Sequence, residues 1–466
     1  MFGPTSSRLE RFHRRLAATS GCDLAGIVGR LLPPRFLRAL ESPGTRRRFF
    51  TRSGTFWLFL CQTLTPQQSC REVVRRAQAE RVRRRRSPMS PGTAGYCLAR
   101  RRLPLPALQD IWCGIATELD RRGGPGWLWH GMRVAVTDGT TTTMPDTPAN
   151  QKCWPQPRSQ KPGCGFPIMK IVAVFALATG AIHAVVCNSM HSAEQAMLQT
   201  FWPYLQNHFD LLLGDRNFGS YATFCELQTR RMHGVFRLHQ GRRMDWRSGR
   251  RLGHGDRLVT WQRPPKLPPT CRRKSLPDTI RVRIVRVQVA FPGFRTQTLF
   301  LATDLTDPRQ FPLAALADLY LQRWRVELFF AHIKTSMHMD VLRCQSPHMI
   351  RRELHMHLVA YNAIRALMLD AARSRQVPLD RVSFKGTCEA LRQFAPHLAA
   401  AAAHPATYRR LLHLFLDSLA EDLVPLRRPR SEPRAVKRRP KNFNRLTKPR
   451  HQMGNLPHRN RGYEEP

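Results

Sequence analysis

Apolar side chains in the first 125 residues follow the spacing of amphipathic helices. They recur at Leu16, Leu24, Ile27, Val28 and Leu31, and again from 56 to 60. Gly and Pro between the apolar groups mark helix ends. We therefore predict that residues 1–125 form a domain of several short helices.

From about residue 127 the pattern changes to short apolar runs typical of strands. Residues 133–137 alternate and stop at Asp138-Gly139, which predicts a strand that ends in a turn. A hairpin is predicted over 169–187 and a helix over 192–208. The apolar run 211–214 then leads into Asp215, and another helix should follow. This alternation predicts an α/β core that begins with residues 126–235.

Residues 236–297 interrupt the alternation with a proline-rich part and then strongly alternating strands. We interpret them as a β-rich insertion that returns the chain to the core. The alternative is that these strands extend the core sheet. Helical patterns return over 298–372, the second part of the core, and over 373–425. Residues 426–466 are cationic, broken by proline and nearly devoid of apolar side chains, so we expect a disordered basic tail.

Charge changes this picture more than composition does. The 466 residues include 76 Lys and Arg against 32 Asp and Glu, a net charge of +44. A charge of this size favours a polyanionic partner, so the N-terminal helices are predicted to bind DNA. An ordinary helical bundle with a basic face is the alternative. The longest apolar run, 171–186, is too short for a membrane span, and we expect a cytoplasmic protein without membrane contact. No CxxC pair occurs, so the twelve cysteines are expected to be free thiols.

One stretch, residues 320–334, carries charged groups in an unusual order. At about 100° per residue of an α-helix, Tyr320, Arg323, Glu327 and Lys334 fall within one stripe of about 60°. A carboxylate in such a stripe suits a metal, and its cations suit phosphates. The alternative is a solvated helix face with ordinary Arg–Glu and Glu–Lys pairs.

Three carboxylates stand out by their context. Asp138 and Asp215 each follow an apolar strand, and Glu327 lies on the charged helix. Phosphodiester chemistry with two Mg²⁺ ions needs such a set, because hard divalent cations prefer carboxylate oxygen. Each residue also has an ordinary alternative: a turn at Asp138, a helix cap at Asp215 and an ion pair with Arg323 at Glu327.

The spacing of Tyr320, Arg323, Glu327 and Lys334 resembles the Y-(2)-R-(3)-E-(6)-K signature of bacterial DDE transposases of the insertion-sequence 4 family. The segments VTDGTTTTMPDTPANQ and LLLGDRNFGSY resemble the family's two aspartate motifs. This resemblance implies an α/β, ribonuclease H-like core with a mixed sheet and a β-rich insertion, preceded by the helical DNA-binding domain.

The resemblance also implies roles for individual residues. Asp138, Asp215 and Glu327 would be the catalytic triad that binds two Mg²⁺ ions, which Mn²⁺ can replace. Tyr320, Arg323 and Lys334 would contact phosphates at the transposon end. Trp324 is a candidate for stacking on an unpaired base, or alternatively a core tryptophan under the helix.

The function implied is cut-and-paste transposition. The protein would bind terminal inverted repeats of double-stranded DNA, pair two ends as a homodimer or higher oligomer, cleave them and join the 3′-hydroxyls to target DNA. It would work on the bacterial nucleoid. One alternative is an inactive or repurposed DNA-binding protein derived from a transposase, and another is a nuclease of similar fold without strand transfer.

Overall fold

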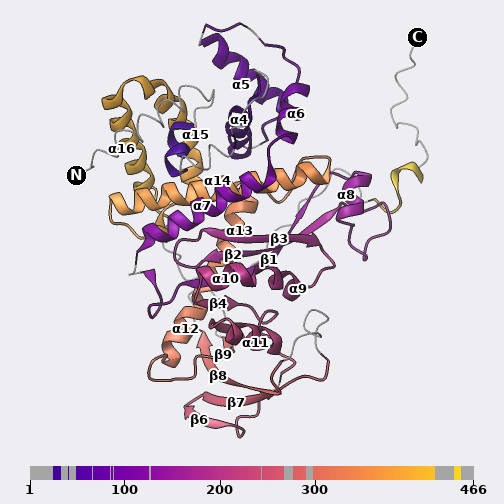
Figure 1. Cartoon of the computed structure of the whole chain (residues 1–466), viewed down its shortest axis with the longest axis vertical. Helices are drawn as coiled ribbons and strands as arrows, with labels where there is room; N and C mark the ends of the chain where they lie inside the picture. The colour runs from indigo at the N-terminus through magenta and orange to yellow at the C-terminus, as the bar shows by residue number, and fades with distance from the viewer. Residues whose placement is uncertain are drawn as a thin grey trace.

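One nine-stranded mixed sheet lies at the centre of the structure, with the strand order β3-β2-β1-β4-β5-β9-β8-β7-β6 (Figure 1). The strands are β1 (Val134–Thr143), β2 (Ile168–Ala176), β3 (Ile182–Ser189), β4 (Leu211–Gly214), β5 (His233–Arg237), β6 (Arg250–Gly253), β7 (Asp256–Gln262), β8 (Thr279–Val289) and β9 (Gln297–Thr303). The computed structural model describes residues 25–32, 40, 49–65, 67–83, 85–87, 89–124, 127–242, 244–266, 276–289, 297–425 and 446–452.

Strand β1 organises the half of the sheet that carries the site. It pairs antiparallel with β2 and parallel with β4, and β4 pairs parallel with β5. The predicted hairpin is β2–β3, and the predicted mixed sheet is confirmed. Alternate residues of β1 enter different cores, since Val134 and Val136 face one apolar cluster and Ala135 faces the other.

The prediction that β1 ends in a turn at Asp138-Gly139 is wrong. The strand continues to Thr143, and Asp138 pairs with Ala173 in the middle of the ladder. The reason is that β2 supplies hydrogen-bonding partners along the whole length of β1, which outweighs the turn preference of an Asp-Gly pair. Asp138 therefore lies within a strand and is held by its pairing with β2.

The strands of the predicted insertion extend the core sheet. β9 pairs with β5, β8 pairs with β9, and β7 and β6 follow outward. This arrangement agrees with the stated alternative to a separate β-rich insertion. Inside these outer strands a buried ion pair joins Arg283 of β8 to Asp256 of β7 at 2.6 Å. The domain boundaries proposed from the sequence stay predictions.

Helices cover both faces of the sheet. One face carries α9 (Glu194–Leu198), η3 (Gln199–Phe201), α10 (Trp202–His208) and α11 (Tyr221–Thr229). The other face packs against α7 (Leu105–Gly123) and the long, mostly buried α14 (Pro347–Ser374). A short helix, α8 (Pro148–Cys153), follows β1.

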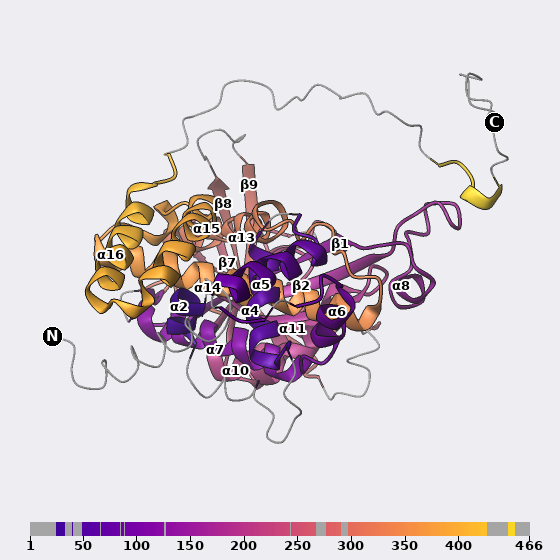
Figure 2. The same cartoon turned by 90° about the horizontal axis from the view of Figure 1, so that it is seen from above.

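Two groups of helices lie side by side over α14 (Figure 2). The N-terminal group comprises α2 (Ala25–Val28), η1 (Gly29–Leu31), α4 (Arg52–Leu64), α5 (Cys70–Arg83) and α6 (Ala94–Arg101). The C-terminal group comprises η6 (Leu379–Arg381), α15 (Phe384–Ala400), η7 (Ala401–Ala403) and α16 (Pro405–Glu421). Helical structure is thus confirmed in the described parts of 1–125 and 373–425.

Cys61 of α4 forms a disulfide, so the prediction of twelve free thiols is wrong there.

Two sequence expectations fall largely outside the described residues. Leu16 and Leu24 precede them, and of the basic tail only 446–452, with η8 (Arg450–Gln452), is described. Within the described ranges, no helix has the length and apolar character needed to cross a membrane.

The charged stretch 320–334 is not one regular α-helix. It comprises the end of α12 (Leu313–Gln322), α13 (Arg325–Ala331) and the π-helical turn η5 (His332–Ser336). The α12–α13 junction lies at Arg323 and Trp324, whose amides bond three residues back, to Tyr320 and Leu321. Both residues keep right-handed helical dihedrals, so the chain continues in the same general direction. The prediction of one regular α-helix over 320–334 is therefore wrong, because the hydrogen bonding is interrupted at Arg323 and Trp324 and changes to π-helical at His332.

Candidate active site

Asp138 and Asp215 lie on neighbouring parallel strands. Val136 of β1 pairs with Leu213 of β4, and each aspartate comes two residues later in its own segment. Because side chains alternate along a strand, both aspartates follow the face of Val136 and Leu213. That face packs against α13 and α14. The parallel register thus brings together two carboxylates that are 77 positions apart in sequence.

Glu327 of α13 is linked to Asp138 by Arg323, which lies near both carboxylates. Arg323 Nη1 lies 3.5 Å from Asp138 Oδ2, and Arg323 Nη2 lies 3.7 Å from Glu327 Oε1. Arg323 itself is buried, whereas the Glu327 side chain is 53% exposed. One guanidinium therefore stands between the carboxylate of a strand and the carboxylate of a helix.

The pKa of Asp138 is raised to about 6, chiefly because its carboxyl is buried. The Gly139 amide and Arg323 lower this pKa, whereas the nearby carboxylates of Asp215 and Glu194 raise it. The Gly139 N–H donates to Asp138 Oδ1 at 2.7 Å. A carboxylate held in this way near other carboxylates is poised to accept a cation.

Tyr320 and Arg323 lie deep in the site. Tyr320 is 3% exposed, and burial raises its pKa to about 12, with nearby Arg323 and Arg237 opposing and Asp215 adding to the rise. Arg323 Nε has no hydrogen-bond partner although it is buried. An unpartnered buried donor beside carboxylates suits an anionic oxygen, such as one of a phosphate seated there.

Lys334 and Trp324 stand nearer the surface. Lys334 Nζ donates to Thr140 Oγ1 of β1 at 3.2 Å, two residues beyond Asp138. The Trp324 ring is 42% exposed and lies 4.9 Å from the Arg323 guanidinium. The alternative of a core tryptophan under the helix is therefore wrong. An exposed indole beside a guanidinium is a suitable platform for a nucleobase.

Sequence reasoning missed two residues of the site. Glu194, at the start of α9, fills the space above Gly139, where a Cβ would overlap its carboxylate. The glycine had been interpreted as a turn, yet it is there because a side chain approaches closely. Arg237 ends β5 beside Tyr320. A lone arginine at a strand end carries no recognisable signal.

The donor chemistry of this site fits a divalent metal. Asp138, Asp215 and Glu327 offer carboxylate oxygens, the ligands preferred by hard cations, and Asp138 is crowded by negative charge. In the present arrangement Arg323 supplies the positive charge between two of them. Across the part of the chain that the structure describes, no three His, Cys, Asp or Glu side chains are close enough to hold a metal ion.

A mixed sheet with two adjacent aspartates and a glutamate on a covering helix defines an enzyme class that acts on phosphodiesters with divalent metal ions. Comparison with known proteins identifies the family. Residues 129–363 match the family of the transposase DDE domain, and the chain belongs to this family. It is a DNA transposase, a metal-dependent enzyme whose partner is DNA, and its core is the mixed α/β sheet described above.

Two known proteins illustrate the similarity. The chain is 25% identical over 430 residues to the transposase InsG of insertion sequence element IS4 from Escherichia coli (strain K12), which covers 89% of this chain and 92% of that relative. Its structure is also similar, with a TM-score of 0.41 and 10% identity, to the piggyBac transposase in a synaptic complex with hairpin DNA, over 91% of this chain and 87% of that one.

Proposed function

We propose that this transposase performs cut-and-paste transposition. It binds the terminal inverted repeats of its element, cleaves at the element's ends and transfers the 3′-hydroxyls to target DNA. The observation that supports the proposal is that Arg323 pairs with both Asp138 and Glu327, while Asp215 is close enough to Asp138 to raise its pKa. Two acids from a strand and a helix that share one buried guanidinium exceed what an ordinary surface ion pair needs.

Asp138, Asp215 and Glu327 are proposed as the metal ligands and catalytic triad. Two Mg²⁺ ions, replaceable by Mn²⁺, suit this set, and such ions activate the attacking oxygen and stabilise the leaving oxygen of a phosphodiester. Pairing with Ala173 of β2 holds Asp138 in the sheet, and Asp215 Oδ1 accepts a hydrogen bond from the Asn217 amide at 2.8 Å. Glu327, on the more exposed helix, is the ligand that adjusts.

The DNA contacts are proposed to divide by depth. Tyr320 and Arg323 are buried beside the carboxylates, so they reach only a phosphate seated at the triad. Lys334 binds a neighbouring phosphate as a point charge, and exposed Trp324 stacks on an unpaired base. We further propose that two copies pair the element's ends, and that the protein works in the bacterial cytoplasm, where the nucleoid DNA lies.

The test uses purified protein and a duplex carrying the inverted repeat that borders the gene, with Mg²⁺ or Mn²⁺. Wild-type protein should release nicked ends and join them to a target plasmid. Asp138→Asn, Asp215→Asn and Glu327→Gln should each lower cleavage more than about a hundredfold, because losing a metal ligand costs at least as much as losing a residue that only orients such a ligand. Asp110→Asn, at an exposed position of α7, is the control.

The outcomes separate the alternatives. Normal cleavage in the three variants would exclude the proposed triad. End binding by wild-type protein without cleavage in either metal would favour the inactive, repurposed DNA-binding protein. Cleavage without joined products would favour a nuclease.

A further inference from the structure

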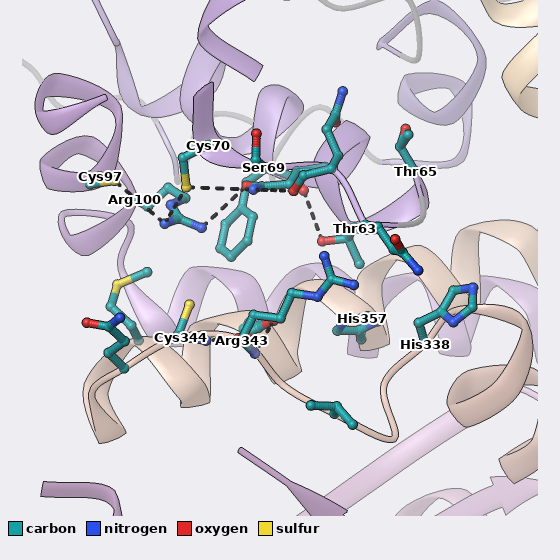
Figure 3. A pocket seen from close by; sticks show the side chains of 18 of the residues that line it. Thr63, Thr65, Ser69, Cys70, Cys97, Arg100, His338, Arg343, Cys344 and His357 are labelled. Atoms are coloured by element: carbon teal, nitrogen blue, oxygen red, sulfur yellow. Dashed lines mark hydrogen bonds between the residues drawn. The ribbon is translucent and has the colours of Figure 1, made fainter. Parts of the chain in front are cut away.

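A cavity of about 670 Å³ lies between the N-terminal helices and the catalytic core. Its upper wall comes from α4, α5 and α6, and its lower wall comes from the loop after η5 and from α14 (Figure 3). The lower loop is tied to β1, because Thr142 Oγ1 donates to the Met339 carbonyl at 2.6 Å. The cavity thus adjoins the strand that carries Asp138, on the order of 15 Å along β1 from that residue.

Three helices begin at this cavity. Ser69 and Cys70 start α5, Thr93 precedes α6, and Ser346 precedes α14, and all four residues line the cavity. The Thr93 and Ser346 side chains make no capping hydrogen bond to their helices. The first amides of a helix lack intrahelical acceptors, and each helix N-terminus carries about half a positive charge. Three such ends around one cavity make it electropositive, although Ser69 Oγ accepts the Glu72 amide of α5 and Pro347 brings no N–H to the start of α14.

Buried polar atoms without partners line the same cavity. Gln68 Oε1, Arg100 Nε and His357 Nδ1 are buried, and none has a hydrogen-bond partner. His357 is 7% exposed, and burial lowers its pKa to about 3, so the ring is neutral. Figure 3 shows His357 and Arg343 on the lower wall and Arg100 on the upper wall. Buried polar atoms without a partner are uncommon in folded proteins and indicate a missing ligand; of these three, Arg100 Nε is a donor, Gln68 Oε1 is an acceptor, and the neutral His357 ring can be either.

The charges of the cavity favour an anion. Arg100 and Arg343 line it, and Arg100 is fixed in place by Gln62 Oε1 at 3.3 Å and Cys70 Sγ at 3.2 Å. Glu353 is the one carboxylate of the lining, and it accepts the amides of Arg343 and Cys344 at 2.9 to 3.0 Å. Both carboxylate oxygens of Glu353 thus accept backbone amides of the loop. The positive charges of Arg100 and Arg343 therefore remain to attract an anionic ligand.

We propose that this cavity is a phosphate-binding site, held by the N-termini of α5, α6 and α14 together with Arg100, Arg343 and His357. The preferred source is a backbone phosphate of DNA whose scissile bond lies at the carboxylates, an inference that rests on the proposed function. A free phosphate is the other source of the same chemistry. In the first case the site clamps the DNA strand between the N-terminal helices and the core, a few nucleotides from the reaction.

The test places a negative charge where the phosphate would bind without harming the helix. Ser346 has extended dihedrals typical of an N-cap, and Asp and Asn are both favourable N-caps. Ser346→Asp should therefore fold normally and repel the anion, whereas Ser346→Asn should fold normally and still bind it. Thermal unfolding of both variants checks that folding is intact.

Two binding measurements then distinguish the sources. In the DNA arm, fluorescence anisotropy with the labelled inverted-repeat duplex is recorded without divalent metal at several salt concentrations. Ser346→Asp should bind about tenfold more weakly than Ser346→Asn, with a salt slope smaller by about 0.9, the value for one lost phosphate contact. In the phosphate arm, inorganic phosphate at constant ionic strength should raise the melting temperature of wild type and Ser346→Asn but not of Ser346→Asp if the source is free phosphate.

A difference between the two variants in either arm supports the site and names its source. If wild-type protein bound and cleaved the duplex while both variants behaved alike in both arms, the phosphate site would be refuted and the proposed function would stand. If wild-type protein neither bound nor cleaved the duplex, the proposed function would fail, and the phosphate arm alone would decide the site.

Discussion

The raised pKa of Asp138 predicts that this residue, when ionised, destabilises the folded protein in the absence of metal. Its pKa is raised to about 6 from an ordinary 3.8, chiefly by burial, and its side chain is only 23% exposed. A carboxyl with a raised pKa binds its proton more tightly in the folded state than in the unfolded state. Stability is therefore lost as the pH rises from about 4 to about 6, and it stays lost above.

The size of the effect follows from the shift. At 1.36 kcal/mol per pKa unit, the shifted pKa of Asp138 lowers the free energy of unfolding by about 3 kcal/mol at pH 7.5 and by about 1.5 kcal/mol at pH 5, relative to a residue with no shift. Asp138→Asn cannot ionise and can still accept the Gly139 amide. We expect this variant to be more stable than wild type by about 3 kcal/mol at pH 7.5, with about half of that gain at pH 5, while it loses cleavage.

Urea denaturation in EDTA at the two pH values measures both quantities, with Asp110→Asn as the control at an exposed aspartate. Saturating Mn²⁺ should then stabilise wild type by about 2.7 kcal/mol at a hundred times its Kd, and Asp138→Asn by much less. The reasoning would be refuted if Asp138→Asn were less stable than wild type at pH 7.5, or if its advantage did not shrink at pH 5.

Three further predictions follow from particular contacts. Gly139→Ala should lower the free energy of unfolding by less than about 1 kcal/mol because the Glu194 carboxylate that its methyl group meets is the end of a flexible side chain, and the double variant with Glu194→Ala should recover that loss in thermal unfolding. Lys334→Ala should weaken end binding about tenfold and lower the salt slope by about 0.9, with Mn²⁺ affinity by calorimetry unchanged; normal end affinity would contradict its role. Asp256→Asn should cost about 3 to 5 kcal/mol in urea denaturation because Arg283 is then left charged and buried, and a loss under 1 kcal/mol would show that the pair is dispensable.

Much of the fold was readable because the signals are local. Alternating apolar residues identified β2 and β3, and the run before Asp215 identified β4. The spaced charges of 320–334 depend on helical periodicity, which survives the irregular junction at Arg323 because the dihedrals stay right-handed. The extent of β1 was misjudged because an Asp-Gly pair favours a turn only where no neighbouring strand competes for its backbone.

The sequence by itself drew attention to Asp138, Asp215 and Glu327 through their types and contexts, and the resemblance to a transposase signature gave them their proposed roles. Only the tertiary structure decided how they meet. The pairing of Val136 with Leu213 brings the two aspartates side by side, and the packing of α13 on the sheet sets Arg323 between Asp138 and Glu327. Glu194 above Gly139 and the cavity under three helix ends were equally unreadable from the chain. The physical reason is that local periodicity reports which face of an element is buried, whereas register and packing between distant segments arise from the summed contacts of the whole core.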